Sequence, residues 1–198
     1  MRTRTVLAAF AWLLVSGCDE NPPAAPHTSS TGVAAQTSSD ASGVPSDLEG
    51  TTSLIDLGAF EKTSAADDPF DDRPADIACE FGFGLEDGFF EFESDLCRYG
   101  AFSQPALAPI RVGDTLDFLL LHENLVSSEP DAQAHVAIAL GEDIVYEAVI
   151  DIPAEANFLD EQWVSTLEVP EGTPVHFHLH NHGINSYRLA ELAVTYAD

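Results

Sequence analysis

The sequence predicts an all-β protein, an antiparallel β-sandwich or jelly roll of about eight strands that follows a long polar N-terminal segment. Short runs of alternating apolar and polar residues, bounded by turn residues, recur through the second half of the chain. An amphipathic helical pattern of more than two turns is absent from this half of the sequence. Just before this half, Cys79 and Cys97 frame an aromatic-rich segment with a central Asp-Gly pair, which is typical of a β-hairpin.

The N-terminus has the pattern of an export signal. Arg2 and Arg4 precede an apolar stretch that is too short to span a bilayer, and the small residues Ser16 and Gly17 then precede Cys18. The segment Val-Ser-Gly-Cys resembles the lipobox of bacterial lipoproteins, in which the cysteine carries lipid after cleavage. This resemblance implies a signal peptide over residues 1–17 and acylation of Cys18, with palmitate among the chains. An ordinary secretory signal with an incidental cysteine is the alternative.

Acylation of Cys18 would anchor the protein in a membrane, outside the cytoplasm. The inner membrane, the outer membrane and the cell surface all remain open as locations. Residues 18–75 are rich in Ser, Thr, Ala, Pro, Gly and Asp, and bury too little apolar surface to offset the entropy of ordering. We therefore expect a low-complexity acidic tether over residues 18–75 and one folded domain over residues 76–198.

The chain is strongly acidic, with 34 acidic and 7 basic residues and a formal net charge of -27. Nucleic-acid binding requires clustered Lys and Arg, and here the basic residues beyond the signal are scattered: Lys62, Arg73, Arg98, Arg111 and Arg188. This charge predicts a solubilising surface and excludes a nucleic-acid partner. The alternative is that two acidic clusters bind a divalent cation. The first cluster is Asp67, Asp68, Asp71 and Asp72, and the second is Glu86 and Asp87. Both clusters lack the ligand spacing of an EF-hand loop.

Cys79 and Cys97 are an even pair in a chain that carries an export signal, and we expect a disulfide between them. A hairpin turn at Asp87-Gly88 leaves Cys79 within one residue of a position opposite Cys97. A single β-bulge would close that mismatch. Metal or redox chemistry by the two thiols is the alternative, but they lack the Cys-x-x-Cys spacing typical of it.

Six further runs predict strands after the cysteines. In the first of them, TLDFLLLH, Leu116 and its alternate neighbours face the core, and in AHVAIAL the same is expected of Val136 and its alternate neighbours. AHVAIAL and IVYEAVI should form a hairpin around residues 141–143, and residues 151–160 are expected to form a loop. QWVSTLEV, PVHFHLH and SYRLAELAVTYA complete the predicted sandwich.

The run PVHFHLHNH carries the strongest chemical signal. Strand alternation directs Val175, Phe177 and Leu179 to the core and directs a stripe of imidazoles to the other face, namely His176, His178, His180 and His182. Neutral imidazoles in His-x-His pairs bind zinc or copper, so we expect a transition-metal site here. Three residues could supply further ligands, although the first lies on the apolar face of its strand: His122, His135 and Glu147. A polar face without metal is the alternative.

Two short resemblances involve the same residues. The segment from His178 to His182 resembles the His-Leu-His-Gly-His segment of multicopper oxidases, which belong to the cupredoxin class. Pro170 and Gly172, followed by alternating histidines, resemble a cupin metal motif. Both resemblances imply a bound metal, but Ile184 and Asn185 stand where the cupin pattern has Glu.

These observations lead to three hypotheses of function, and no catalytic residue is assigned. The first is a lipid-anchored β-sandwich that binds copper or zinc. The second is a carbohydrate- or peptide-binding module that contacts a cell-envelope polymer without metal, through aromatic residues such as Phe158, Trp163 or Tyr187. The third is a metal-dependent enzyme, which would need an open coordination position and an acid or base such as Glu147.

Overall fold

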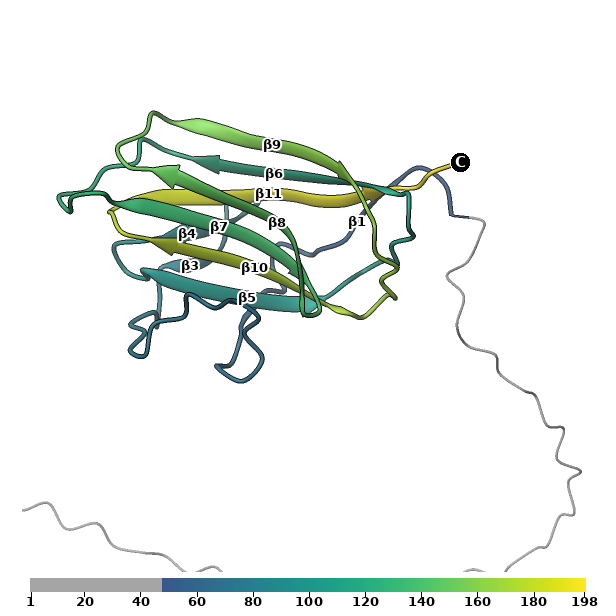
Figure 1. Cartoon of the computed structure of the whole chain (residues 1–198), viewed down its shortest axis with the longest axis horizontal. Helices are drawn as coiled ribbons and strands as arrows, with labels where there is room; N and C mark the ends of the chain where they lie inside the picture. Colours follow the sequence, from purple (N-terminus) through teal and green to yellow (C-terminus); the bar gives the residue numbers. More distant parts are fainter. Residues whose placement is uncertain (1–47) are drawn as a thin grey trace, which may run out of the picture. The chain divides into compact units, whose positions relative to one another are not determined.

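The prediction of an all-β fold is confirmed by the computed structural model, which describes residues 48–198. Eleven strands form two antiparallel sheets that pack as a sandwich (Figure 1). The lipobox with Cys18 lies outside the described residues. Among residues 48–198, no helix has the length and apolar character needed to cross a membrane.

The first sheet has six strands in the order β3-β4-β11-β6-β9, and β1 also pairs with β11. We call it the six-stranded sheet. Its strands are β1 (Thr51–Ser53), β3 (Phe83–Glu86), β4 (Phe89–Glu93), β6 (Thr115–His122), β9 (Asn157–Val164) and β11 (Ser186–Thr195).

The second sheet has five strands in the order β2-β5-β10-β7-β8. We call it the five-stranded sheet. Its strands are β2 (Glu61–Lys62), β5 (Tyr99–Pro105), β7 (Gln133–Leu140), β8 (Asp143–Asp151) and β10 (Pro174–Asn181). Strand β10, which carries the predicted histidine stripe, lies between β5 and β7 and is hydrogen-bonded to both.

The strand pairing decides between the two predicted architectures. Each of the last eight strands pairs with the strand that mirrors it along the chain: β4 with β11, β5 with β10, β6 with β9, and β7 with β8. This nested pairing, with four strands in each layer, is the order of a jelly roll.

Alternation along the strands directs the predicted residues inward. Leu116, Val136 and Phe177 are at most 1% exposed, and they pack between the sheets with Phe90 and Phe102. The predicted hairpin between β7 and β8 is also present. The expected loop at residues 151–160 is shorter than predicted, because β9 already begins at residue 157 and pairs with β6 along its whole length. Of the predicted strand QWVSTLEV, residues 162–169, only the first three residues belong to β9, which ends at Val164.

The hairpin at Asp87-Gly88 is confirmed. Both residues have positive φ, 49° and 88°, as a two-residue turn of this kind requires, and Glu86 pairs with Phe89. The predicted disulfide between Cys79 and Cys97 is also present. A turn after β4, rather than the expected bulge, brings Cys97 next to Cys79. In this turn the amide of Cys97 donates to the carbonyl of Glu93 at 3.0 Å.

The folded domain begins earlier than residue 76. Strands β1 and β2 lie in the stretch predicted to be tether, and Leu54 and Phe60 belong to the buried core. The following segment, residues 63–78, contains Phe70, which is 4% exposed. We call this segment the strap. The overall composition of the strap is polar, but apolar residues spaced among its aspartates and prolines make buried contacts with the domain.

Candidate functional site

Strand β10 places its histidines on the outer face of the five-stranded sheet. Val175, Phe177 and Leu179 are fully buried in the core, as alternation predicts. On the outer face, His178 pairs with Ala101 of β5 and Ala137 of β7. Because β10 is hydrogen-bonded on both sides, the backbone positions of these histidines are fixed by the sheet.

The strap covers this outer face. The ring of Phe70 stacks on that of His178, with centroids 4.4 Å apart and planes at 23°. Ala101, Ala137 and Ala139 surround the contact and are at most 5% exposed. Their small side chains leave the room that Phe70 fills. His178 is consequently 0% exposed, although it lies on the outer face of the sheet.

Polar contacts also fasten the strap to β5. The hydroxyl of Tyr99 donates to Asp68 at 2.8 Å, and Asp68 also forms an ion pair with Arg73. Burial and the neighbouring Asp68 raise the pKa of Tyr99 far above its usual value, so the hydroxyl keeps its proton. The amide of Thr63 donates to the carbonyl of Ala101 at 2.8 Å.

Asp72 of the strap meets three imidazoles at one carboxylate oxygen. Its Oδ2 atom lies 2.9 Å from Nδ1 of His180, 3.1 Å from Nδ1 of His135 and 3.2 Å from Nε2 of His178. Its Oδ1 atom is buried without a hydrogen-bond partner. The cluster thus combines residues from the strap, β7 and β10.

The other nitrogens of two imidazoles have acceptors of their own. Nδ1 of His178 lies 3.1 Å from the carbonyl oxygen of Gly100, and Nε2 of His135 lies 2.9 Å from a carboxylate oxygen of Glu147. Carbonyl and carboxylate oxygens only accept, so a hydrogen bond to either needs a proton on the ring nitrogen, and a neutral ring has one such proton. The remaining nitrogen of each ring, Nε2 of His178 and Nδ1 of His135, faces the carboxylate of Asp72.

The pKa values show how protons are distributed in the cluster. Burial alone raises the pKa of Asp72, but hydrogen bonds from His135, His178 and His180 together hold it well below its usual range. The hydrogen bond to Asp72 raises the pKa of His135, against the effect of burial. Burial lowers the pKa of His178 despite the nearby carboxylate. Asp72 is therefore ionised and His178 is neutral at pH 7.

Neutral His178 has one N–H for two acceptors, the carbonyl oxygen of Gly100 at 3.1 Å and the ionised Asp72 at 3.2 Å. In the tautomer that donates from Nδ1 to Gly100, the lone pair of Nε2 faces the carboxylate. A metal cation between them would accept electron pairs from both atoms and remove the repulsion. Ligand atoms of Asp72, His135 and His178 all lie within 4.8 Å of one another, and Nδ1 of His180 lies 2.9 Å from the same oxygen of Asp72.

The surrounding contacts are those that support metal-binding histidines. A ligating imidazole usually donates its second N–H to a carbonyl or a carboxylate, which fixes the tautomer and the ring orientation. Gly100 provides the carbonyl for His178, and Glu147 provides the carboxylate for His135. Glu147 thus contacts Nε2 of His135. The enzyme hypothesis instead requires Glu147 to act as an acid or base toward a substrate.

The structure separates the four histidines of the predicted stripe. His178 and His180 belong to the cluster. His176 is 5% exposed with an unpartnered Nδ1, and burial lowers its pKa, but it is not among the grouped ligands. His182 follows the end of β10 and is exposed, with its ring centroid 4.9 Å from that of His180.

The three residues proposed as further ligands lie in different places. His135 joins the cluster, and Glu147 contacts it. His122 lies in the six-stranded sheet, is 5% exposed, and its Nδ1 is 2.9 Å from the carbonyl of Glu123. Sequence reasoning named Asp72 only within an acidic run. The one available signal was Phe70, an aromatic residue inside that run.

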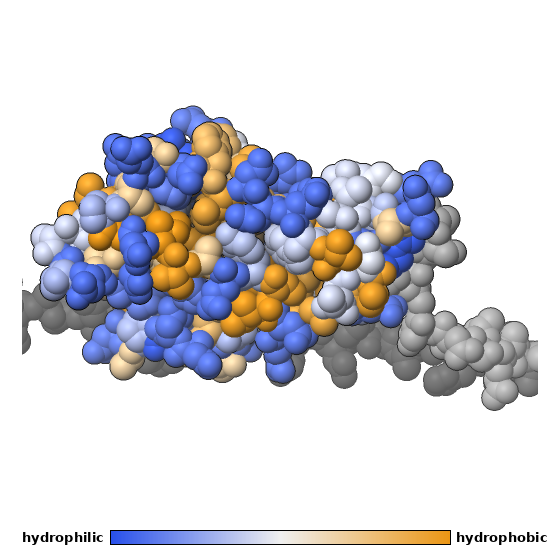
Figure 2. All heavy atoms as spheres, turned by 45° about the horizontal axis from the view of Figure 1, so that its top comes forward, coloured by the Kyte–Doolittle hydropathy of each residue, from blue (hydrophilic) through white to orange (hydrophobic). Residues whose placement is uncertain are grey.

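The outer face of the six-stranded sheet also has a small hollow. It measures about 180 Å³ and is lined by apolar Leu121 and Phe158 and by polar Asn157, Glu123 and Arg188. Phe158 is 60% exposed. In the view that brings the β9 edge forward, apolar residues form separate patches among polar ones (Figure 2). The other two suggested aromatics differ from Phe158, since Tyr187 is fully buried and Trp163 is half-buried and stacked on Tyr146.

No protein-family model and no curated protein matches this chain. Among solved structures, a xylan-binding module of family CBM15 is 10% identical, with a TM-score of 0.45, covering 75% of this chain and 97% of the module. A family 11 carbohydrate-binding module from Clostridium thermocellum, in complex with a mixed-linked tetrasaccharide, is 9% identical, with a TM-score of 0.36 and coverages of 76% and 98%. A CBM4 structure is 8% identical, with a TM-score of 0.39 and coverages of 60% and 90%.

These three neighbours are carbohydrate-binding modules rather than cupredoxins or cupins. Likeness at this level of identity and TM-score carries no argument about the ligand of this chain.

Proposed function

We propose that this protein binds a transition-metal ion, zinc or copper, through Asp72, His135 and His178, with His180 as a fourth ligand. The observation that carries the proposal is the convergence of ring nitrogens of His135, His178 and His180 on the Oδ2 atom of Asp72, at distances of 2.9 to 3.2 Å. The nitrogen-rich ligand set favours zinc, copper or nickel over calcium or magnesium, which prefer oxygen ligands.

Calorimetric titration of the protein, purified without a polyhistidine tag, with zinc and copper at neutral pH tests the proposal. We expect dissociation constants below 0.1 mM for at least one ion, a value of roughly that size separating a site from weak surface association. Asp72→Asn removes a ligand at constant size and should weaken binding by at least about tenfold. Asp71→Asn alters an exposed neighbouring carboxylate and should leave binding unchanged. Weak binding of both ions, or equal affinity of the two variants, would contradict the proposal.

The same proposal places the protein in the cell envelope, anchored by lipid on Cys18. It rests on the basic residues, the short apolar stretch and the lipobox that converge on that cysteine. Radiolabelled palmitate should enter the wild-type protein in cells, and Cys18→Ser should abolish labelling and detergent partitioning. Labelling that persists in Cys18→Ser would show that the lipid is attached elsewhere or that the anchor is assigned wrongly.

A carbohydrate ligand is the second candidate function, favoured by the hollow beside Phe158. An exposed aromatic ring next to amide, carboxylate and guanidinium groups offers both a stacking surface and hydrogen-bond partners for a sugar ring. This candidate uses the outer face of the six-stranded sheet and therefore does not compete with the metal cluster for residues.

Affinity electrophoresis in gels that contain xylan or mixed-linkage β-glucan tests this candidate. One structural neighbour is a xylan-binding module, and another is a module in complex with a mixed-linked tetrasaccharide, so these two polysaccharides are the first to test. Retarded migration that Phe158→Ala abolishes, and that a chelator leaves intact, would support a carbohydrate site in the hollow. Unretarded migration in both gels would contradict binding of these two polysaccharides.

A further inference from the structure

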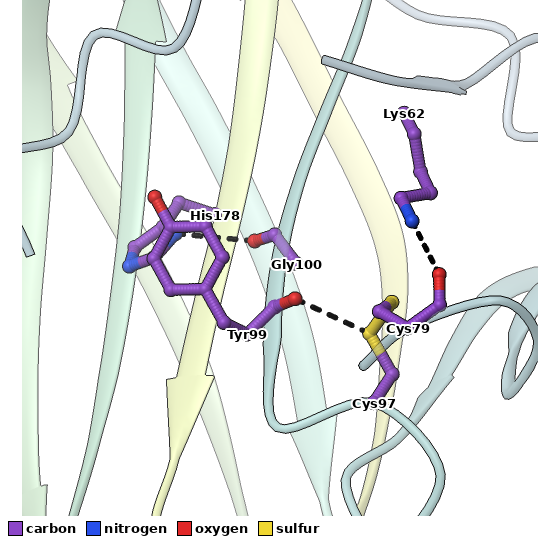
Figure 3. The surroundings of a disulfide bond; sticks show 6 residues. All are labelled: Lys62, Cys79, Cys97, Tyr99, Gly100 and His178. Atoms are coloured by element: carbon purple, nitrogen blue, oxygen red, sulfur yellow. Dashed lines mark hydrogen bonds between the residues drawn. A yellow bond between two sulfur atoms is a disulfide. The ribbon is translucent and has the colours of Figure 1, made fainter. Parts of the chain in front are cut away.

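The disulfide lies at the meeting point of both halves of the metal cluster. Cys79 directly follows the strap that carries Asp72, and Cys97 lies two residues before the start of β5, which carries Gly100. The two cysteines are at most 1% exposed. Figure 3 shows the disulfide beside Tyr99 and Gly100, with His178 on the far side of the β5 backbone.

A short chain of contacts connects the disulfide with His178. Sγ of Cys97 lies 3.4 Å from the carbonyl oxygen of Tyr99, and the next carbonyl, that of Gly100, accepts from Nδ1 of His178 at 3.1 Å (Figure 3). This second contact holds one edge of the His178 ring against β5, while Nε2 on the opposite edge faces Asp72. The position of Cys97 thus bears on how the ring of His178 is oriented toward the ion.

The disulfide also closes the strap on the other side. Nζ of Lys62, at the end of β2, donates to the carbonyl of Cys79 (Figure 3). The strap therefore leaves β5 beside Lys62 and returns to it at Cys79, where the disulfide is the covalent attachment. Without that bond, the stretch from Asp72 to Cys79 would depend on the partly buried Ile77 and on the Lys62 contact.

We propose that the metal site is conditional on oxidation: the disulfide between Cys79 and Cys97 positions both Asp72 and His178, and the reduced protein binds the ion weakly. This inference rests on the proposed metal-binding function and adds its regulation. A dithiol reductant would supply two electrons and two protons. The Sγ–Sγ bond would break, two thiols would remain, and the reductant would become a disulfide.

The physical basis is linkage between two sites. If forming the disulfide raises the affinity for the ion by some factor, binding the ion must favour the disulfide over the dithiol by the same factor. Coupling of this kind usually amounts to about 5- to 150-fold in affinity. A protein that is exported before it is oxidised would therefore acquire its metal only outside the cytoplasm, where disulfides form.

The test measures zinc affinity by calorimetry in the full-length wild-type protein and in the double variant Cys79→Ala/Cys97→Ala. We expect the double variant to bind zinc at least about tenfold more weakly. Val194→Ala, in β11 of the other sheet, is the matched control, because it destabilises the core without altering the strap, and its zinc affinity should be unchanged. Equal affinity of wild type and a folded double variant would overturn the inference.

A second measurement decides the matter if the double variant does not fold. The wild-type protein is titrated with a dithiol reductant, and free thiols are counted with and without saturating zinc. Zinc should shift the midpoint to about tenfold higher reductant in wild type and should have no effect in Asp72→Asn. An unchanged wild-type midpoint would refute the coupling. Wild type that binds no zinc at all would instead refute the proposed function, so the two failures are distinguishable.

Discussion

The outer faces of the two sheets carry carboxylates in opposite circumstances. On the six-stranded sheet, Asp117 accepts hydrogen bonds from the amide of Gln162 at 2.6 Å and from the hydroxyl of Thr195 at 3.1 Å, beside open solvent. Over the five-stranded sheet, Asp72 of the strap meets His135 and His178, as well as a third imidazole. Both faces belong to the same acidic chain. The proposed metal site therefore depends on one carboxylate and its partners, and the net charge by itself does not create it.

The largest expected effect compares one phenylalanine on each outer face. Phe70 is 4% exposed and packs on His178, so Phe70→Ala should lower the free energy of unfolding by about 3 kcal/mol. Phe158 is 60% exposed, and Phe158→Ala should change it by less than about 0.5 kcal/mol. Urea unfolding in the presence of a chelator measures both values. Equal costs would mean that the strap is not docked on the sheet in solution.

A smaller effect is expected from filling the space that the strap occupies. Ala137 is fully buried beneath Phe70, so Ala137→Leu should overpack the contact and cost about 2 kcal/mol. Asp160→Leu adds the same side chain to the open face of β9 and should stay within about 0.5 kcal/mol. Thermal unfolding of the two variants provides the comparison. A cost at Ala137 as small as that at Asp160 would indicate that the outer face of β7 is as open as that of β9.

The smallest expected effect concerns pH. The folded protein raises the pKa of His135, so it binds that proton more tightly than the unfolded chain does. The resulting stabilisation is complete below the unfolded pKa of about 6.5 and disappears as the pH rises through the folded value. In the presence of a chelator, His135→Gln should therefore cost more stability at pH 5.5 than at pH 9.

The matched control for this pH effect is His182→Gln, since His182 is exposed beyond the end of β10. Its effect on the free energy of unfolding should be the same at both pH values. If His135→Gln also shows no dependence on pH, the interaction of His135 with Asp72 does not stabilise the folded protein.

Most of the sandwich could be predicted because its strands alternate. Leu116, Val136 and Phe177 each belong to a run in which every second residue faces the core, and local residue types alone reveal this pattern. The prediction begins strand β9 too late, since half of the residues of Asn157–Val164 are polar and its first half lacks regular alternation. Its position is determined by pairing with β6, a contact between distant parts of the chain.

The candidate site could be predicted only in part for the same reason. His178 and His180 were identifiable from their spacing on one strand, which is local information. Asp72 lies 106 and 108 positions earlier than these residues, and 63 positions before His135. No local pattern connects residues at such separations, and the acidic, proline-rich composition around Asp72 is also typical of a disordered segment.

The jelly-roll order has a consequence for the rate at which an ion would be exchanged. Strands β7 and β10 are hydrogen-bonded to neighbours on both sides, so His135, His178 and His180 are carried on backbone that moves only with the sheet. Asp72 is carried on a loop instead. The residence time of a bound ion would then be governed by how often that loop lifts, and dissociation would be slow even at modest affinity.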